Sequence, residues 1–465
     1  MSFKIYFEKY KDNVAAKSDE GLNVTYGDIL EYSEEFSKII DDRCLVFSLC
    51  KNTIGSLMGY IGCIINGYVP LLIDAALDRD LLSRLLNTYY PKYIWVPEEI
   101  AEEFPDFKLI FKKYGYNLLK TNFCQEYKIN KNLALLLTTS GSTGSPKLVR
   151  QSYTNIFSNA QAIGEYLKLD ENEKPITTLP MNYTYGLSII NSHLLKGGTI
   201  LLTTRTLMQK EFWDFLRTEQ ATSFGGVPYT YEILKRLRFF RMDLPSIKTL
   251  TQAGGKLPKE ITMEFANYCL GKGICFFVMY GQTEATARMS YLPSEYALSK
   301  AGSIGIAIPG GEFLLKDDNG KVITEPYTVG ELNYRGPNVT LGYAEKASDL
   351  CKYDDRNGEL ETGDMAERDE EGFYYITGRK KRFIKMYGNR INLDEVEALI
   401  KPITGECACV GEDDKMKIYV TEKDKEAEIK SFISNKTGIN HLGFEVYNIP
   451  EIPKNESGKT IYTKL

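Results

Sequence analysis

The chain has 465 residues, an apolar fraction of 43% and a formal net charge of −5, from 57 basic and 62 acidic side chains. This length is enough for roughly two to four domains with a large buried core. A weakly acidic chain without long basic runs argues against a nucleic-acid-binding surface, and it gives no electrostatic reason to lie on an anionic membrane. We therefore expect a small-molecule partner and no nucleic acid.

The cysteines and histidines indicate the cellular location and restrict the possible reaction mechanisms. The nine cysteines are scattered without a Cys-x-x-Cys pair, which favours a reducing, cytoplasmic location. Only His193 and His441 are present, so we do not expect a mechanism built on a histidine base. The N-terminus lacks a signal-peptide pattern, and the longest apolar segment, residues 56–73, contains Asn66, three glycines and Pro70. We expect a core helix running into a strand there and no membrane span.

Helix and strand patterns alternate along the first 280 residues. Apolar residues at helical spacing predict helices, and short apolar runs between turn signals predict strands. The predicted helices are residues 27–40, 56–66, 78–89, 154–167, 210–218, 229–239 and 258–269. The predicted strands are residues 44–49, 69–73, 93–96, 133–138, 199–202, 223–227, 249–252 and 274–279. This alternation predicts an α/β domain with parallel or mixed sheets flanked by helices.

The pattern changes after about residue 294 to short strands and turns, which predicts a β-rich subdomain. A basic cluster at residues 379–382 then precedes a predicted strand, residues 383–386, and a helix, residues 393–400, of a small α+β unit. We place a domain boundary at this cluster, with a large N-terminal domain of residues 1–380 and a small, mobile C-terminal domain of residues 381–465. The cluster's charge alone is also typical of a solvated turn.

One loop has the composition of a phosphate-binding site. Residues 133–150, LALLLTTSGSTGSPKLVR, are a short apolar run followed by small hydroxyl residues, glycines and a lysine. Glycines let backbone N–H groups approach phosphate oxygens, hydroxyls add donors, and the lysine supplies a charge. The candidate residues are Thr139, Ser140, Gly141, Ser142, Thr143, Gly144 and Lys147. The spacing does not match a Walker loop, and a flexible surface linker is the alternative interpretation.

Three other stretches place chemical groups beside glycines. The sequence Tyr-Gly-Gln-Thr-Glu at residues 280–284 follows a predicted strand, at the end where α/β sheets bind ligands. Glu-Thr-Gly-Asp at residues 361–364 offers a carboxylate suited to a diol, and residues 453–459, PKNESGK, place a lysine on a loop. Each stretch alone is a weak signal, because such side chains usually lie on the surface.

Together, in this order and spacing, these stretches resemble the adenylate-forming superfamily, which contains acyl-CoA synthetases, carrier-protein-loading adenylation domains and beetle luciferases. The resemblance covers nearly the whole chain. It includes TSGSTGSPK at 139–147, YGQTE at 280–284, GELNYRGPNVTLGY at 330–343, TGD at 362–364, GRKKRFIKMYGNRINLDEVE at 378–397 and PKNESGK at 453–459. It implies an AMP-forming acid–thiol ligase, which activates a carboxylic acid as acyl-AMP, releases pyrophosphate and passes the acyl group to a pantetheine thiol.

The resemblance also implies roles for single residues around ATP. Tyr280 would stack on adenine, and Thr283 would contact the α-phosphate. Glu284 would hold Mg²⁺, a hard cation that prefers carboxylate and phosphate oxygens. Asp364 would accept hydrogen bonds from both ribose hydroxyls, with Arg379 nearby.

The remaining implied roles concern phosphates and the mobile domain. The loop of residues 139–147 would bind the β- and γ-phosphates, and Lys459 would be the catalytic lysine that the small domain brings to the reacting groups. Lys381 matches the hinge, Gly388 would face the pantetheine tunnel in a second pose, and Arg390 would contact a phosphate in one of the two poses.

The resemblance places the acid pocket around residues 179–186. Tyr183 takes the position of a gating aromatic, and the aspartate that pairs with the α-amino group in amino-acid-activating relatives is missing. The other walls would be Gly226, Gly254, Gly255 and Gly281, with Gly225 and Ala253 by analogy. Such a roomy, uncharged pocket favours an aliphatic or aromatic carboxylic acid.

The thiol acceptor is either CoA or a separate phosphopantetheinylated carrier protein, because no carrier domain follows the lysine loop. Two departures from the family pattern are present, of which the first bears on this choice and the second has no physical explanation. Residues 382–465 look trimmed, and Glu359 or Leu360 replaces the aromatic that usually precedes the TGD motif. A luciferase-like oxidation and a non-catalytic nucleotide-binding relative are further alternatives, although the retained Lys459, Glu284 and Asp364 argue against the second.

Overall fold

The computed structural model describes residues 3–40, 42–138, 147–386, 389–412, 414–437, 440–455, 458 and 460–465. The chain forms two compact units. Unit 1 comprises Met1–Glu312 and Arg335–Leu360, and unit 2 comprises Phe313–Tyr334 and Glu361–Leu465. The domain boundary between residues 380 and 381 stays a prediction.

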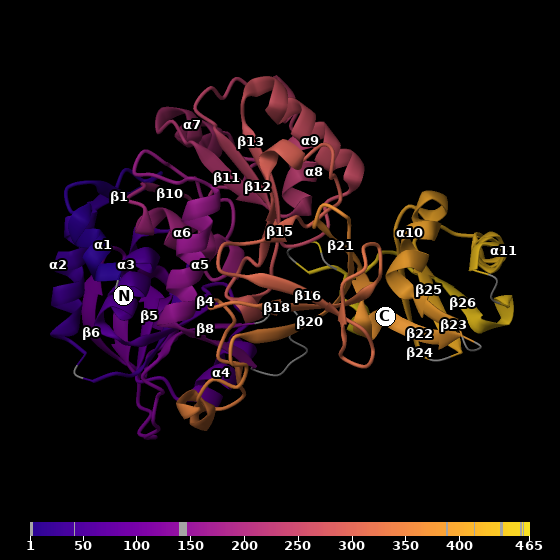
Figure 1. The fold of residues 1–465 in the computed structure, drawn as a ribbon. Coiled ribbons are helices and arrows are strands. Elements are labelled where there is room, and N and C mark those ends of the chain that lie inside the picture. The colour runs from indigo at the N-terminus through magenta and orange to yellow at the C-terminus, as the bar shows by residue number, and fades with distance from the viewer. Residues whose placement is uncertain are drawn as a thin grey trace. The chain divides into compact units, whose positions relative to one another are not determined.

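A large mixed sheet forms the centre of the N-terminal part of unit 1 (Figure 1). Its inner strands β8, β4, β3 and β5 are parallel, and antiparallel strands extend it on both sides. In sheet order the strands are β19 (Tyr343–Ala344), β9 (Leu148–Ser152), β8 (Leu133–Thr138), β4 (Val69–Asp74), β3 (Leu45–Cys50), β5 (Tyr93–Pro97), β7 (Tyr116–Lys120) and β6 (Lys108–Lys113).

Two smaller sheets complete unit 1. One joins three parallel strands to two antiparallel ones in the order β11 (Ser223–Gly226), β12 (Thr249–Gln252), β13 (Cys275–Tyr280), β14 (Ser290–Leu292) and β15 (Ile306–Ala307). The other has the order β10 (Ile200–Leu202), β1 (Val14–Ser18) and β2 (Asn23–Thr25).

The helices of unit 1 begin and end at recognisable signals. Thr25 and Asp28 form a capping box at the start of α2, and Gly67 ends α3 in a left-handed conformation with φ of 79°. The helices are α1 (Phe3–Lys9), α2 (Tyr26–Ser37), α3 (Ile54–Asn66), α4 (Arg79–Tyr89), α5 (Tyr153–Tyr166), α6 (Thr184–Leu195), α7 (Lys210–Thr218), α8 (Pro228–Arg236) and α9 (Lys259–Lys272).

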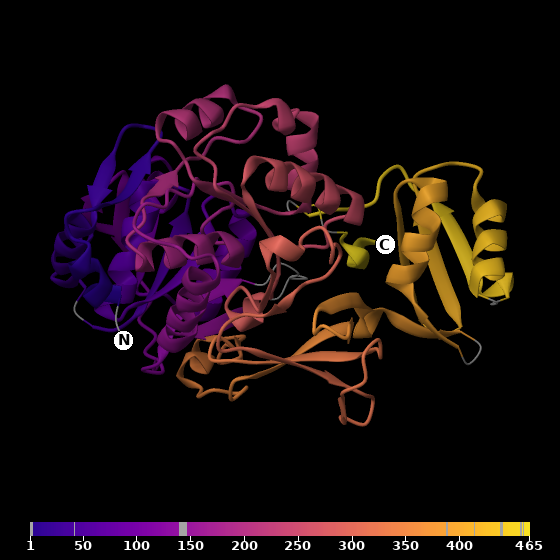
Figure 2. The same cartoon turned by 45° about the horizontal axis from the view of Figure 1, so that its top comes forward.

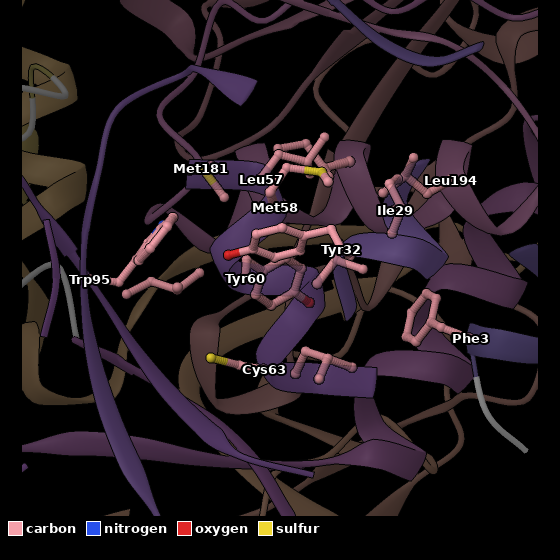
Figure 3. Close-up of a cluster of buried hydrophobic side chains, with 14 of the residues drawn as sticks. Phe3, Ile29, Tyr32, Leu57, Met58, Tyr60, Cys63, Trp95, Met181 and Leu194 are labelled. Carbon is pink, nitrogen blue, oxygen red and sulfur yellow. The ribbon is translucent and has the colours of Figure 1, made fainter. Parts of the chain in front are cut away.

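Alternate residues of each central strand supply separate apolar cores on the two faces of the large sheet. Phe47 of β3 packs in one core, whereas its neighbour Val46 packs in the other, around α3. Figure 3 shows this second core, in which Leu57 and Tyr60 of α3 lie among side chains from several other elements, including Trp95 of β5. Burying each such side chain stabilises the fold by about 1.5–3 kcal/mol.

Unit 2 consists of β-structure followed by a small α+β arrangement. A five-stranded sheet has the order β17 (Val322–Ile323), β16 (Glu312–Lys316), β18 (Gly330–Arg335), β20 (Glu359–Arg368) and β21 (Tyr374–Arg379). A hairpin of β22 (Phe383–Met386) and β23 (Asn389–Asn392) follows, and then a sheet of β24 (Cys407–Glu412), β25 (Lys415–Val420) and β26 (Phe444–Asn448). Helices α10 (Leu393–Thr404) and α11 (Glu426–Thr437) pack on this last sheet (Figure 2).

The predicted α/β class with a β-rich region and a final α+β unit is confirmed. Residues 56–73, predicted to be a core helix followed by a strand, form α3 and β4. Among the described residues, every helix is too short or too polar to cross a membrane.

We expect the mutation Gly59→Ala in α3 to destabilise unit 1. A Cβ atom at residue 59 would lie 2.2 Å from Nε1 of the buried Trp95, so the ring must shift. Such overpacking lowers the free energy of unfolding by about 1–3 kcal/mol. Both tryptophans, Trp95 and Trp213, lie in unit 1, so urea unfolding followed by tryptophan fluorescence measures the change.

The matched control is Gly271→Ala in α9, where an added Cβ meets nothing within 4 Å. Alanine favours helix over glycine by about 1 kcal/mol, so this variant should be neutral or more stable. Equal destabilisation by both substitutions would contradict the packing argument.

Candidate active site

The strands that frame the predicted phosphate loop form an antiparallel pair. Thr138 of β8 lies opposite Leu148 of β9 in the register, and the loop connects them. The six loop residues predicted to bind phosphate before Lys147 lie outside the described residues: Thr139, Ser140, Gly141, Ser142, Thr143 and Gly144. Lys147 itself is described, and its Nζ lies 3.7 Å from the ring centroid of Tyr343 in β19. The loop's lysine therefore lies at the edge of the large sheet, next to an aromatic ring.

A tight turn follows β13 and carries the predicted Tyr280, Gly281, Thr283 and Glu284. A Cβ atom on Gly281 would lie 1.7 Å from the carbonyl oxygen of Ala287, so only glycine fits at this position. The backbone N–H of Met289 donates to the carbonyl of Tyr280 at 2.9 Å and closes the turn. The turn therefore fixes where the side chains of residues 282–286 leave the sheet.

Glu284 is anchored through its backbone and oriented through its carboxylate. Its carbonyl oxygen accepts hydrogen bonds from Thr340 N–H at 3.0 Å and from Arg356 Nη1 at 2.9 Å. Its Oε1 accepts from the hydroxyl of Tyr343 at 2.7 Å. Burial, followed by this bond to Glu284, raises the pKa of Tyr343 to about 12, so the phenol keeps its proton and donates.

These contacts bring two predicted residues to one aromatic side chain. Lys147 lies over the ring of Tyr343, and Glu284 binds its hydroxyl. The guanidinium of Arg356 lies 4.7 Å from the same ring centroid. A cation suited to phosphate and a carboxylate suited to a metal therefore lie together in unit 1.

The donor set of Glu284 fits Mg²⁺ bound to a nucleotide. Tyr343 is the hydrogen-bond donor to its carboxylate, and among the described residues no lysine or arginine forms an ion pair with that carboxylate. The described residues also contain no cluster of three His, Cys, Asp or Glu that would hold a metal ion. Mg²⁺ is commonly bound through one or two carboxylates together with substrate phosphates, and a single available carboxylate meets this requirement.

Asp364 and Arg379, the predicted ribose-binding pair, lie opposite each other in unit 2. They face each other across β20 and β21, and Arg379 Nε lies 3.3 Å from Asp364 Oδ1. Asp364 is buried, and its N–H donates to the Thr362 hydroxyl at 3.1 Å, next to Gly363, which adopts a φ of 71° within β20. The pair thus holds a carboxylate inside β20 beside the arginine that ends β21.

Part of the predicted acid pocket assembles at the start of α6. Gly254 adopts a φ of 83°, and a Cβ atom there would lie 2.6 Å from the hydroxyl of Tyr183. Tyr183 packs against an apolar cluster that includes Tyr185, Val227 and Met279. Burial raises the pKa of Tyr183, so its hydroxyl is neutral near pH 7.

The other predicted pocket glycines lie close to the same elements. A Cβ atom on Gly226 would lie 2.7 Å from Thr230 Cγ2, and one on Gly255 would lie 3.1 Å from Pro228 Cγ, so both glycines border α8. Gly281 lies two residues beyond Met279 of the cluster.

Three further predicted residues belong to the C-terminal part of unit 2. Lys459 and Gly388 lie outside the described residues. Lys381 lies in a short 3₁₀ segment, Lys380–Arg382, between β21 and β22. Their roles stay predictions.

The sequence analysis missed Arg288, which follows the turn after β13. Its side chain is 2% exposed, and its guanidinium lies 5.2 Å from the ring centroid of Tyr185, beside the predicted acid pocket. We expected the walls of the acid pocket to be uncharged, and we did not predict a buried cation beside them. The available signal was a basic residue four positions after the last residue of the Tyr-Gly-Gln-Thr-Glu motif.

Comparison with known proteins decides the family. Residues 3–344 match the family described as AMP-binding enzyme. The chain belongs to this family. It is an AMP-forming acid–thiol ligase.

Two named relatives agree with this assignment. The chain is 28% identical to a 2-succinylbenzoate–CoA ligase of Bacillus cereus over 73% of its own length and 71% of the relative's. It is 25% identical to a ligase of the same name from a Geobacillus species, over 90% and 87% of the two chains.

Two solved structures share the fold. The o-succinylbenzoate CoA synthetase of Bacillus subtilis in complex with its acyl-adenylate intermediate matches with a TM-score of 0.77 and 20% identity, over 99% of this chain and 97% of that one. ATP-bound MatB from Rhodopseudomonas palustris matches with a TM-score of 0.78 and 19% identity, over 100% and 98%.

We expect Tyr343→Phe to weaken the response of the enzyme to Mg²⁺. The substitution keeps the ring under Lys147 but removes the hydroxyl that orients the Glu284 carboxylate. Loss of a residue that hydrogen-bonds a metal ligand typically lowers metal affinity or activity about 10- to 100-fold. The Mg²⁺ concentration for half-maximal ATP–pyrophosphate exchange should rise accordingly. Tyr353→Phe, at a position 84% exposed, is the control, and an unchanged Mg²⁺ dependence in Tyr343→Phe would refute the role of the hydroxyl.

Proposed function

We propose that this ligase converts a carboxylic acid other than an amino acid into its CoA thioester. The observation that carries the nucleotide site is the cluster of Lys147, Tyr343 and Glu284 at the ends of β9 and β13, where a phosphate chain and its metal can be held together. The names of the relatives support CoA as the acceptor and make 2-succinylbenzoate the first acid to test.

The proposed binding of ATP divides among four groups of residues. Residues 139–144 and Lys147 would bind the β- and γ-phosphates, and Glu284 would hold Mg²⁺, which supplies positive charge to the phosphates when bound. Tyr280 would stack on adenine, while Thr283 would contact the α-phosphate. Asp364, held by Arg379 at 3.3 Å, would accept from the ribose hydroxyls.

The chemistry of acyl-adenylate formation needs positioning and charge more than proton transfer. A substrate carboxylate oxygen attacks the α-phosphorus, and the bond to the departing pyrophosphate breaks, so negative charge gathers around one centre. Lys459 would bridge the carboxylate and the α-phosphate and stabilise that charge. No general base is required, because the nucleophile is already ionised at neutral pH.

Thioester formation would use a second arrangement of the small domain. The thiol sulfur bonds to the acyl carbonyl carbon and releases its proton to solvent, while AMP leaves with the electrons of the acyl–phosphate bond. Residues 381–465 would turn about Lys381, removing Lys459 and presenting Gly388 to a pantetheine tunnel. A hinge of a few residues can absorb such a rotation.

The sequence of the acid pocket supports a class of substrate, and the cysteines support a cellular location. The segment of residues 179–186 carries no aspartate to pair with an α-ammonium group, which disfavours amino acids. All nine cysteines are free, in keeping with a cytoplasmic location. Loading of a separate carrier protein is the second candidate for the thiol step, because the same adenylate serves both acceptors.

An acid panel tests the proposed substrate class. ATP–pyrophosphate exchange should occur with 2-succinylbenzoate or with other aromatic or aliphatic acids, and not with amino acids. Radiolabelled acyl groups should then appear on free CoA. Exchange with amino acids alone would overturn the acid assignment, and label found only on a phosphopantetheinylated protein would replace CoA by a carrier.

We expect Lys459→Ala to separate the two half-reactions. Losing one preorganised charge at the transition state typically lowers the rate about 100- to 1,000-fold, so exchange should fall by that amount. Thioester formation from preformed acyl-AMP should be largely spared. Lys454→Ala is the control, because Lys454 pairs with Glu406 on the surface of unit 2. Equal loss of both half-reactions in Lys459→Ala would contradict the two-pose mechanism.

A further inference from the structure

Arg288 is a buried cation whose hydrogen-bond partners are all neutral. Its Nε donates to the Ser188 hydroxyl at 3.1 Å, and its Nη1 donates to the Tyr166 hydroxyl at 2.9 Å and contacts Met279 Sδ at 3.2 Å. Its Nη2 has no hydrogen-bond partner. Among the residues that the structure describes, no Asp or Glu forms an ion pair with this guanidinium.

The other buried arginine of unit 1 shows what a structural role requires. Arg150 has a fully buried side chain, and it pairs with Asp355 at 2.5 Å. Its nitrogens also donate to backbone carbonyls, including those of Tyr343 at 3.0 Å and Lys352 at 2.7 Å. Burying a charge is costly unless it is paired and fully hydrogen-bonded, and Arg150 meets this condition whereas Arg288 does not.

The position of Arg288 relates it to the acid pocket. Its guanidinium lies over Tyr185, whose ring centroid lies 6.4 Å from that of Tyr183, the proposed gating aromatic. The Tyr185 hydroxyl contacts Thr251 Oγ1 at 2.8 Å, and a Cβ atom on Gly225 would lie 2.7 Å from that hydroxyl. The incompletely bonded cation therefore contacts Tyr185, which belongs to the segment proposed to bind the acid and lies beside Gly225 of the same pocket.

We infer that Arg288 determines specificity by pairing with a second anionic group, a carboxylate, on the acid that the enzyme activates. This inference rests on the proposed function, in which one carboxylate reacts with ATP. A second carboxylate would supply the missing acceptor for Nη2 and neutralise the buried charge. A monocarboxylic acid of the same shape would leave that charge unpaired, so the site rejects it. The substrate class is thus a dicarboxylic acid, and 2-succinylbenzoate has two carboxyl groups.

Matched pairs of acids in the ATP–pyrophosphate exchange assay test the pairing. The pairs are 2-succinylbenzoate with 4-oxo-4-phenylbutanoate, and glutarate with pentanoate, which differ by one carboxylate. The wild-type enzyme should prefer the dicarboxylic member of at least one pair by about 100-fold in kcat/KM, because truncating one partner of a buried charge pair has an effect of this order. In Arg288→Met the preference should disappear, mainly through a higher KM for the dicarboxylic acid, while exchange with the monocarboxylic acid is retained.

Two further variants separate charge from structure. Arg288→Lys keeps a cation and should retain part of the preference, and it also serves if Arg288→Met fails to fold. Tyr166→Phe removes the neutral partner of Nη1 and leaves the charge, so the preference should be unchanged. Tryptophan fluorescence verifies folding of each variant. Wild-type preference for the monocarboxylic acids, or equal loss with all four acids in a folded Arg288→Met, would overturn the inference.

Calorimetric binding of the same acids distinguishes failure of this inference from failure of the proposed function. If exchange shows no preference for dicarboxylic acids and both members of each pair bind equally, the role of Arg288 is rejected. The proposed ligase reaction is then retained. If the wild-type enzyme binds a dicarboxylate, Arg288→Met does not, and no exchange occurs with any of these acids, the pairing is supported. The proposed reaction on these acids is then rejected. Absence of both binding and exchange overturns the inference together with the proposed acid.

Discussion

The close approach of Gly281 to the carbonyl of Ala287 is the constraint on which the proposed nucleotide site depends. No side chain fits at residue 281, so the chain turns back within a few residues of the end of β13. That turn delivers Glu284 to Thr340 and Arg356, which bind its carbonyl, and to Tyr343, which binds its carboxylate. The side chain that would hold the metal is therefore positioned by backbone geometry before any ligand binds.

The same turn ends near Arg288, the residue that we propose pairs with the acid. Arg288 lies seven positions after Gly281, between Ala287 and Met289 of the segment that returns as β14. One short segment thus carries a carboxylate for the metal at one point and a buried guanidinium at another. This arrangement couples recognition of the nucleotide and of the acid to a single local structure.

The sequence predicted the regular elements well because apolar periodicity determines which faces are buried. The predicted helix of residues 210–218 coincides with α7, and the predicted strand of residues 249–252 coincides with β12. Helix α6 was missed, because Thr184–Leu195 is buried on nearly all sides and has little amphipathic pattern. The hairpin of β6 and β7 was also missed, since the lysines and mixed polarity of residues 108–113 obscure an edge strand.

The site was predictable only where a motif carries the chemistry. Glu284 and Lys147 could be named from their motifs, but their shared contact with Tyr343 depends on the pairing of β19 with β9, which brings together residues almost 200 positions apart. The state of Arg288 could not be read from the sequence, because whether a buried cation has an anionic partner depends on packing. Tyr166, Tyr185 and Ser188, which surround it, are ordinary helix residues in the sequence.

The position of Tyr343 affects how two charged side chains of the protein would bind a triphosphate. One phenol ring separates Lys147 on its face from Glu284 at its hydroxyl, so it works as a rigid spacer between opposite charges. The spacer keeps the lysine from neutralising the carboxylate directly, as a surface ion pair would. Both charges thus stay available to an incoming ligand, and little rearrangement is needed when a polyphosphate and its cation displace the ring from the ammonium group.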